Sequence, residues 1–536
     1  MTLMSTTRLG IDVGGTNTDA VLVDEHGRVL AKSKQGTTPD VTTGIIAALR
    51  DVIEHHGSSY PIAYAMLGTT HCTNAVVERR GLVPVAVLRI GAPASTAIPP
   101  FTDWPPDLRA AVDGRVAIVR GGFEFDGREI VPLDEPAIER FAETLEPGRA
   151  VAVVSIFSPV TDAHERRAAA IIRTVAGAGT VLSLSSEIGT VGLLERENAT
   201  ILNAALTDVA RRATDGFRQA ILALGLKARC YLTQNDGTLM DWDYARRYPI
   251  FTIASGPTNS LRGALYLSGA ANAVVVDVGG TTTDVGALSQ GYPRESAVAV
   301  EIGGVRTNFR MPDLVSVGLG GGSLVRVADG RVQVGPDSVG YALTTKALIF
   351  GGESLTLSDA AVRAGLTRFG DPKRLAGLNR DVVDEALTNT HQRIAEAVDR
   401  MKTSVDAVTV VAVGGGAFLV PDRLPGASRV LRPADSDVAN AIGAAIGEAS
   451  GEVDRVYSLD TIDRHDALHA AESEAVRKAV AAGSDPARTR IVDREEMPLA
   501  YLPGSATRIR IKAAGPLRGM ALEARERPAQ SGEGEE

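Results

Sequence analysis

A nine-residue motif suited to binding phosphate and a metal occurs twice in the chain. Ile11-Asp-Val-Gly-Gly-Thr-Asn-Thr-Asp19 recurs as Val276-Asp-Val-Gly-Gly-Thr-Thr-Thr-Asp284, and the copies differ only at the first and seventh positions. Glycine allows a sharp turn close to a ligand, and successive N–H groups with threonine hydroxyls can surround phosphate oxygens. An aspartate at a strand end can bind Mg2+ or its waters. The repeat therefore predicts two phosphate-binding turns.

Residue type suggests a role for each member of the two copies. We expect Asp12 and Asp277 to be the catalytic residues and to hold Mg2+ and its waters. Asp284 is a further candidate metal ligand, as is Asp19, although an aspartate in this place can instead close the turn through its own backbone. The candidate phosphate-binding residues are Gly14, Gly15, Thr16, Asn17, Gly279, Gly280, Thr281 and Thr282.

Apolar, strand-like segments flank each copy and place it at the turn of a β-hairpin. Residues 8–11 and 20–23 surround the first copy, and residues 273–276 and 285–288 surround the second. A Gly-Gly-Thr turn is also ordinary hairpin chemistry, but two nearly identical copies favour a shared function. The wide spacing of the copies predicts two similar lobes that hold a nucleotide between their hairpins, because a solenoid would need shorter and more numerous repeats.

A third glycine-rich segment follows a mostly apolar strand. Residues 408–413 lead into Gly414, Gly415 and Gly416, which would let adenine or ribose approach the backbone. The alternative is an ordinary strand-to-helix turn. Residues 436–445 then combine a serine N-cap with a helix of small residues. The absence of GxxxxGK(S/T), of a clear GxGxxG after a strand and of GxSxG argues against P-loop, Rossmann and serine-hydrolase proteins.

These segments resemble the actin, Hsp70 and sugar-kinase superfamily. The hairpins are similar to its two phosphate loops, residues 408–417 to its adenosine-binding segment, and residues 436–445 to the connecting helix at its interdomain hinge. The resemblance implies an α/β fold: two actin-like (ribonuclease H-like) ATPase lobes around an interdomain nucleotide cleft, plus a small C-terminal α/β unit. The expected boundaries are 1–195 and 196–450 for the lobes, 451–525 for the C-terminal unit and 526–536 for a disordered tail.

Further motifs narrow the resemblance to the hydantoinase A/oxoprolinase family. GTTHCTNAVVERRG at residues 68–81 is similar to the GTT-x-x-TNAL-x-ER-x-G signature of that family. Shorter matches are SGP at 255–257, EIGG at 301–304, VGLGGGS at 317–323 and SDA at 358–360. Longer members carry histidine where Leu67 and Val315 stand, and residues 339–352 occupy the place of their DPGPACYG stretch. Any role of those histidines is absent here, which weakens substrate inference from the longer members.

The resemblance implies ATP-dependent opening of a cyclic amide such as a hydantoin, 5-oxoproline or a related lactam. Amide resonance makes the carbonyl a poor electrophile, and phosphorylation of its oxygen provides a good leaving group. The implied cofactors are ATP and Mg2+, with catalysis by positioning and charge neutralisation. Family members often form one subunit of a two-subunit enzyme, so a second hydantoinase-type subunit and an oligomer are expected. The alternatives are a small-molecule kinase of the same superfamily and an ATP-driven reactivase or chaperone-like protein.

Composition excludes several other classes of protein. The 536 residues carry a formal charge of -9, and no basic cluster is present to bind nucleic acid. The two cysteines, Cys72 and Cys230, predict a reducing, cytoplasmic location without a disulfide framework. No apolar run reaches the ~18 residues of a membrane helix, and the first residues lack an apolar signal core, so no membrane association is expected.

Overall fold

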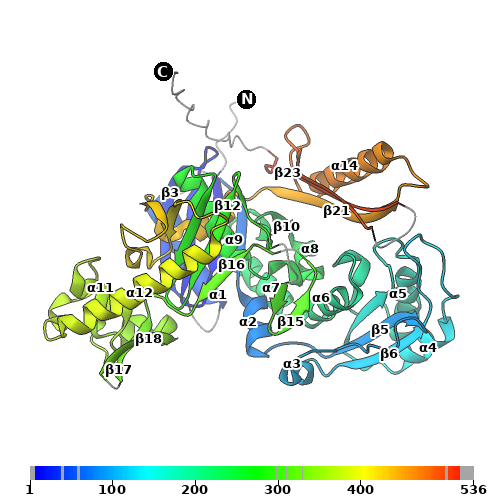
Figure 1. Cartoon of the computed structure of the whole chain (residues 1–536), viewed down its shortest axis with the longest axis horizontal. Coiled ribbons are helices and arrows are strands. Elements are labelled where there is room, and N and C mark those ends of the chain that lie inside the picture. The colour runs from blue at the N-terminus through cyan, green and yellow to red at the C-terminus, as the bar shows by residue number, and fades with distance from the viewer. Residues whose placement is uncertain are drawn as a thin grey trace.

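The computed structural model describes residues 7–37, 41–56, 61–296, 300–309, 311–328, 330–500 and 505–518. The predicted tail at residues 526–536 lies outside these ranges. Within them, the chain forms two large mixed sheets, a smaller parallel sheet and the helices that cover them (Figure 1). None of the helices described is long and apolar enough to cross a lipid bilayer.

The first sheet has nine strands and contains the first copy of the motif. β1 pairs antiparallel with β2 and parallel with β4, and β1 is buried along its whole length. A strand that is covered on both faces needs a continuous apolar run, which the sequence of β1 largely provides. In hydrogen-bonded order the strands are β22 (Arg490–Pro498), β23 (Ala506–Gly515), β21 (Ala449–Ser458), β10 (Leu239–Asp241), β9 (Arg229–Thr233), β4 (Ile62–Thr69), β1 (Thr7–Val13), β2 (Asn17–Val23) and β3 (Val29–Gly36).

The hydrogen bonding of this sheet runs across the predicted domain boundaries. β9 and β10 belong to the block predicted as the second lobe, yet they extend the sheet of the first. The strands of the predicted C-terminal unit join the same sheet through the pairing of Leu239 with Ala449. We therefore propose that the C-terminal unit is a continuation of the first lobe's sheet rather than a separate layer.

The second sheet contains the second copy of the motif, and the remaining strands form smaller sheets. The second sheet has the order β13 (Tyr292–Pro293), β12 (Thr283–Ser289), β11 (Ala273–Val278), β19 (Val408–Val413) and β20 (Ala427–Leu431), with β16 (Leu314–Val317) paired to β12. A parallel sheet consists of β6 (Arg115–Arg120), β5 (Val85–Ala92), β7 (Ala150–Ser155) and β8 (Leu182–Leu184). Two hairpins are β14 (Val300–Ile302) with β15 (Val305–Thr307), and β17 (Ser323–Ala328) with β18 (Arg331–Ser338).

Helices fill the spaces between and around these sheets. In chain order they are α1 (Val41–His56), α2 (His71–Glu78), α3 (Pro106–Ala111), α4 (Glu135–Glu143), α5 (Ala163–Ala176), α6 (Leu193–Ala205), α7 (Thr207–Ala223), α8 (Trp242–Arg247), α9 (Ser255–Ser268), α10 (Leu343–Lys346), α11 (Leu357–Ala364), α12 (Arg380–Met401), α13 (Ala439–Ala445) and α14 (Arg464–Ala481). In Figure 1, α14 covers β21 and β23, whereas α4 and α5 lie on the parallel sheet.

Helices α9 and α13 pack between the two large sheets. Leu261 and Ala264 of α9 pack against Val275 of the second sheet, whereas Ala441 and other residues of α13 pack against Val21 of the first. The predicted helix of small residues is thus present at 439–445. It forms the contact between the halves that carry the two hairpins.

Glycine allows the backbones at this junction to touch. A Cβ added to Gly263 of α9 would overlap the backbone carbonyl of Ala439 in α13, and one added to Gly443 of α13 would overlap the carbonyl of Asn259. A Cβ on Gly10 of β1 would overlap the carbonyl of Ala441. No larger residue fits at these positions, because the obstructing atoms are backbone and cannot rotate away.

We expect Gly263→Ala to destabilise the chain by about 2 kcal/mol or more, because the added methyl forces α9 and α13 apart. Gly377→Ala is the matched control, since a Cβ there meets no atom within 4 Å. Urea unfolding of both variants measures the effect. Equal stability of the two variants would contradict the proposed backbone contact.

Candidate active site

The two motif hairpins have the same internal geometry. Asp12 stands opposite Asp19 across β1 and β2, and Asp277 stands opposite Asp284 across β11 and β12. Each turn is closed by one backbone bond: the Gly14 amide donates to the Asn17 carbonyl at 3.0 Å, and the Gly279 amide donates to the Thr282 carbonyl at 2.9 Å. The sequence repeat is therefore also a structural repeat.

The tips of the two hairpins meet across the junction of the sheets. The hydroxyl oxygens of Thr16 and Thr281 lie 3.3 Å apart, and a Cβ on Gly280 would lie 2.6 Å from Cγ2 of Thr16. Gly15, Thr281 and Thr282 are exposed. Eight predicted phosphate-binding residues are thus brought to one place, although they come from opposite halves of the chain.

Backbone contacts behind each turn hold it in position. Thr37 supports the first turn: its amide donates to the Thr16 carbonyl at 2.9 Å and its hydroxyl to the Gly14 carbonyl at 2.8 Å. The amides of Gly321 and Gly322 support the second turn by donating to the carbonyls of Gly279 and Gly280. The VGLGGGS motif is therefore a buried support for the second hairpin.

Asp12 is a buried carboxylate with few partners. The Asn440 side-chain amide donates to its Oδ2 at 2.9 Å, and its Oδ1 is buried without a hydrogen-bond partner among the described residues. A Cβ on Gly68 would lie 2.5 Å from both that Oδ1 and the Asn259 amide nitrogen. Burial, with further repulsion from Asp19 and Asp277, raises the pKa of Asp12 to about 7.

Asp277 has a matching environment in the second half. Ser260 Oγ donates to its Oδ2 at 2.5 Å, and a Cβ on Gly414 would overlap its Oδ1. Burial, together with repulsion from Asp284, raises the pKa of Asp277 to about 6. Asn259 and Ser260 are consecutive residues of α9, so one helix contacts the carboxylates of both hairpins.

The outer carboxylates have partners of their own. Lys34 Nζ lies 2.5 Å from Oδ1 of Asp19, and Ser316 Oγ donates to Asp284. Burial raises the pKa of Asp284. Among the described residues, no three histidine, cysteine, aspartate or glutamate side chains are grouped closely enough to hold a metal ion by themselves. The predicted metal role of Asp12, Asp277 and Asp284 therefore needs further ligands from water or phosphate.

The three-glycine turn after β19 packs against the second hairpin. Gly414 has a positive φ of 86°, and the Gly416 amide donates to the Val278 carbonyl at 2.7 Å. A Cβ on Gly416 would lie 2.7 Å from Cγ1 of Val278. Gly415 is exposed, and its Cβ position lies 3.8 Å from Lys34 Nζ. Two of the predicted adenosine-binding glycines thus have a packing role, which leaves Gly415 facing the opposite lobe.

Several site residues are absent from the sequence-based prediction. Lys34 carries the one amine seen beside these carboxylates, and Asn259, Ser260 and Asn440 donate to or flank them. Their sequence signals are weak: a lysine on the strand that follows the first motif, two polar residues in the mixed sequence of α9 and one in the small-residue helix α13. Proximity to the carboxylates arises from the register of β2 with β3 and from the α9–α13 packing.

Other motifs of the family signature have structural contacts. Arg79, from the ERRG end of the 68–81 segment, donates through Nη2 to the Gly303 carbonyl of EIGG at 2.9 Å. Asp359 of the SDA motif closes a capping box with Thr356 at the start of α11. Leu67, where longer members have histidine, is buried in the core of the first sheet.

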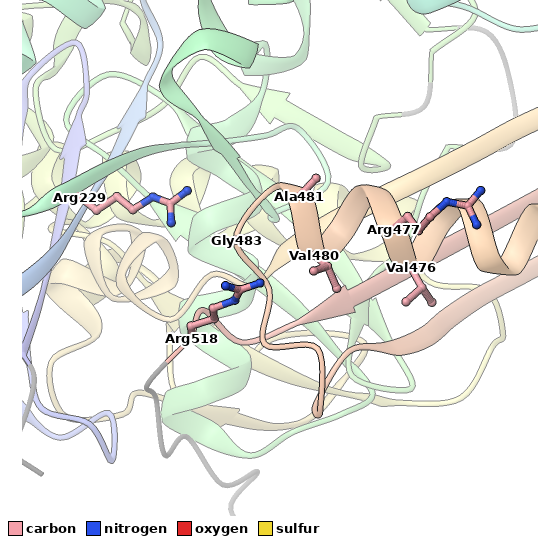
Figure 2. Close-up of a pocket in the computed structure, with 7 residues that line it drawn as sticks. All are labelled: Arg229, Val476, Arg477, Val480, Ala481, Gly483 and Arg518. Atoms are coloured by element: carbon pink, nitrogen blue, oxygen red, sulfur yellow. The ribbon is translucent and has the colours of Figure 1, made fainter.

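A surface pocket of about 530 Å3 lies outside this constellation, at the end of α14. Figure 2 shows Arg229 and Arg518 extending toward Gly483, whereas Arg477 points away from them. The pocket is lined by residues of β9, α14 and the end of the described chain, and it contains none of the predicted site residues.

Comparison with known proteins agrees with the hairpin geometry. The hydantoinase/oxoprolinase N-terminal region model matches residues 8–176, and the hydantoinase/oxoprolinase model matches residues 196–371. The chain belongs to the hydantoinase/oxoprolinase family. This confirms the resemblance on which the sequence-based expectations rest.

Relatives within the family include subunits of larger enzymes. Caprolactamase subunit alpha of Pseudomonas jessenii is 28% identical over 437 residues, which are 75% of this chain and 61% of that protein. The acetone carboxylase beta subunit of Xanthobacter autotrophicus is 27% identical and matched over 67% of this chain and 54% of its own length. The chain thus spans less than two thirds of the length of each of these curated relatives.

Solved structures confirm the actin-like ATPase fold. The ATP-dependent caprolactamase structure from Pseudomonas jessenii superposes with a TM-score of 0.74 at 21% identity, covering 96% of this chain and 88% of that one. The nucleotide-free acetone carboxylase structure gives a TM-score of 0.72 at 19% identity, with the same coverage.

We expect Asp12→Asn to stabilise the chain at neutral pH. The pKa of Asp12 is 3.8 in the unfolded chain and about 7 in the folded chain. At pH values between these two, the folded chain binds a proton that the unfolded chain lacks, so the free energy of unfolding falls as pH rises. The variant lacks this carboxylate and should be more stable by at least about 1 kcal/mol near pH 8, with the gain vanishing below about pH 4. Urea unfolding of the variant and the parent chain between about pH 4 and about pH 8 measures this gain in stability. A gain that does not change with pH would contradict the prediction.

Proposed function

We propose that this chain is the ATP-dependent subunit of an enzyme that opens a cyclic amide by phosphorylating the amide oxygen. The observation that carries the proposal is the meeting of two nearly identical phosphate-type turns, each preceded by a buried carboxylate. Relatives described as a caprolactamase subunit and as 5-oxoprolinase support the cyclic-amide chemistry.

The turns supply the groups that phosphoryl transfer needs. Backbone amides and the hydroxyls of Thr16 and Thr281 face the junction and bind phosphate oxygens. Because the tips touch in this structure, the phosphates enter by parting them, with α9 and α13 as the connection about which the halves move. Lys34 offers a cation from the first lobe, and Gly415 faces it from the second.

The carboxylates suit a hydrated divalent cation. Asp12 has a buried oxygen without a hydrogen-bond partner among the described residues, and burial together with neighbouring carboxylates raises the pKa values of both Asp12 and Asp277. Mg2+ keeps several waters and takes one or two carboxylates, which matches this sparse donor set. When bound, Mg2+ would neutralise charge on the phosphates. Asn440 and Ser260 orient the two carboxylates toward it.

The chemistry proceeds in three steps. The amide oxygen attacks the terminal phosphorus of ATP, the bond to the bridging oxygen breaks, and ADP leaves. A first water then adds to the activated carbon, and the C–N bond of the ring breaks as the nitrogen takes up a proton, which leaves an acyl phosphate. A second water hydrolyses the acyl phosphate to a carboxylate and inorganic phosphate. We propose that a second hydantoinase-type subunit takes part, because the relatives are named as subunits and are longer than this chain.

We expect ring amides to stimulate release of ADP and phosphate from Mg-ATP, and Asp277→Asn to reduce that rate by about a hundredfold or more. The purified chain is assayed with hydantoins and lactams, with and without a candidate partner subunit. Asp337→Asn, an exposed carboxylate on β18, serves as the control and should match the parent chain. A stable phosphorylated product would indicate a kinase instead, and stimulation by a protein alone would indicate a reactivase.

Lys34→Met should raise the KM for ATP by about tenfold, because it removes the cation that faces the phosphate turns. Lys32→Met is the matched control: it lies two residues away on the same face of β3, where it pairs with Asp435 and Asp437. Its KM for ATP should change by less than about threefold. Similar effects of both substitutions would show that Lys34 has no particular role.

A further inference from the structure

A cavity of about 1010 Å3 has none of the predicted site residues in its lining. Its lining comes from the loops at 158–162 and 186–190 beside the parallel sheet, from residues within 234–251, which include α8, and from β21 with α14. Further lining residues are Arg166, Glu295, Asn308, Phe309 and Arg510. In Figure 1, α8 lies below β21. Its volume lies at the upper end of the range found for small-molecule sites.

One wall of the cavity is aromatic. The ring centroid of Tyr244 lies 4.5 Å from that of Tyr248 and 6.3 Å from that of Phe251. The ring centroids of Phe251 and Phe309 lie 6.2 Å apart. Tyr244 is 42% exposed although it belongs to this cluster, because it faces the cavity. Its hydroxyl has no hydrogen-bond partner among the described residues. A flat ligand could therefore stack on Tyr244 and bond to its hydroxyl.

Another part of the lining is ionic, and its cations are paired with carboxylates. Arg510 pairs with Glu452 at 2.6 Å, with Asp493 at 2.5 Å and with Glu295 at 3.4 Å. Lys512 pairs with Asp236 at 2.5 Å. Burial opposes ionisation of Asp236, but Lys512 holds its pKa at about 2. The other cations of the lining are also paired, Arg166 with Asp162, and Arg455 and Lys478 with Glu474. The lining carries eight carboxylates and four cations, so an incoming carboxylate meets excess negative charge.

Hydrogen bonds connect this cavity to the hairpin carboxylates. Asn235 lines the cavity, and its carbonyl accepts a bond of 2.7 Å from Thr258 Oγ1. Thr258 precedes Asn259 and Ser260 on α9, which flank Asp12 and Asp277. Three consecutive residues of one helix thus contact a residue that lines the cavity, the first hairpin and the second.

We propose that this cavity binds the ring substrate, that the ring stacks on Tyr244, and that the ring carries no carboxylate. The inference rests on the proposed function, which it narrows to neutral or cationic ring amides. A ring acid of the 5-oxoproline type would meet the excess negative charge of the Arg510 wall without gaining an ion pair.

The test compares 2-pyrrolidinone with 5-oxoproline, which share a five-membered lactam ring and differ by one carboxylate. Binding to the full chain is measured by calorimetry without ATP. We expect 2-pyrrolidinone to bind at least about tenfold more tightly. Tyr244→Ala should weaken its binding by about tenfold or more, whereas Tyr244→Phe keeps the ring and most of the affinity. Tyr292→Ala, a similarly exposed tyrosine outside the cavity, should have no effect.

The outcomes separate this inference from the proposed function. Equal binding of the ring acid, or 2-pyrrolidinone binding that Tyr244→Ala leaves unchanged, would overturn the cavity assignment even if ring amides stimulate ATP hydrolysis. Absence of any lactam-stimulated ATP hydrolysis would overturn the proposed function, and the calorimetric comparison would still report on the cavity. Circular dichroism of each variant verifies that it is folded.

Discussion

Backbone contact between α9, α13 and β1 is the constraint on which the rest of the structure depends. The contact is possible only because Gly10, Gly263 and Gly443 lack side chains where carbonyl groups of the neighbouring element pass. It joins the two large sheets through a pair of buried helices, which fixes how the hairpin tips meet. It also delivers Asn440 to Asp12 and Ser260 to Asp277, so the same packing that connects the halves orients the carboxylates.

Electrostatics at this junction oppose stability in the absence of a ligand. Asp12 and Asp277 are buried, repel neighbouring carboxylates and have raised pKa values, while Lys34 neutralises only Asp19 directly. A residue set of this kind is costly to the folded state and is typical of a site that acquires a cation with its ligand. The proposed entry of Mg-ATP would remove that repulsion and couple nucleotide binding to the position of the two halves.

The structure also separates two kinds of binding surface. The hairpins present backbone amides and hydroxyls suited to phosphate, whereas the cavity near Tyr244 presents aromatic rings and a neutralised ionic wall suited to an organic ring. Helix α9 contacts both through Thr258, Asn259 and Ser260. In the proposed function, this helix is the element through which substrate and nucleotide are held in a fixed relation.

The sequence by itself determined the hairpins, the actin-like fold and the family, because the nine-residue repeat and the 68–81 signature are local patterns whose turn chemistry needs no distant partner. It did not reveal Lys34 or Asn440, nor that β9, β10 and β21 extend the first sheet across the predicted boundaries. Two of the three glycines after β19 proved to pack on Val278 and Asp277. These features were decided by tertiary structure, because strand register and helix contact join residues from 15 positions apart, as for Lys34 and Asp19, to 428, as for Asn440 and Asp12. No local pattern encodes which of these residues meet.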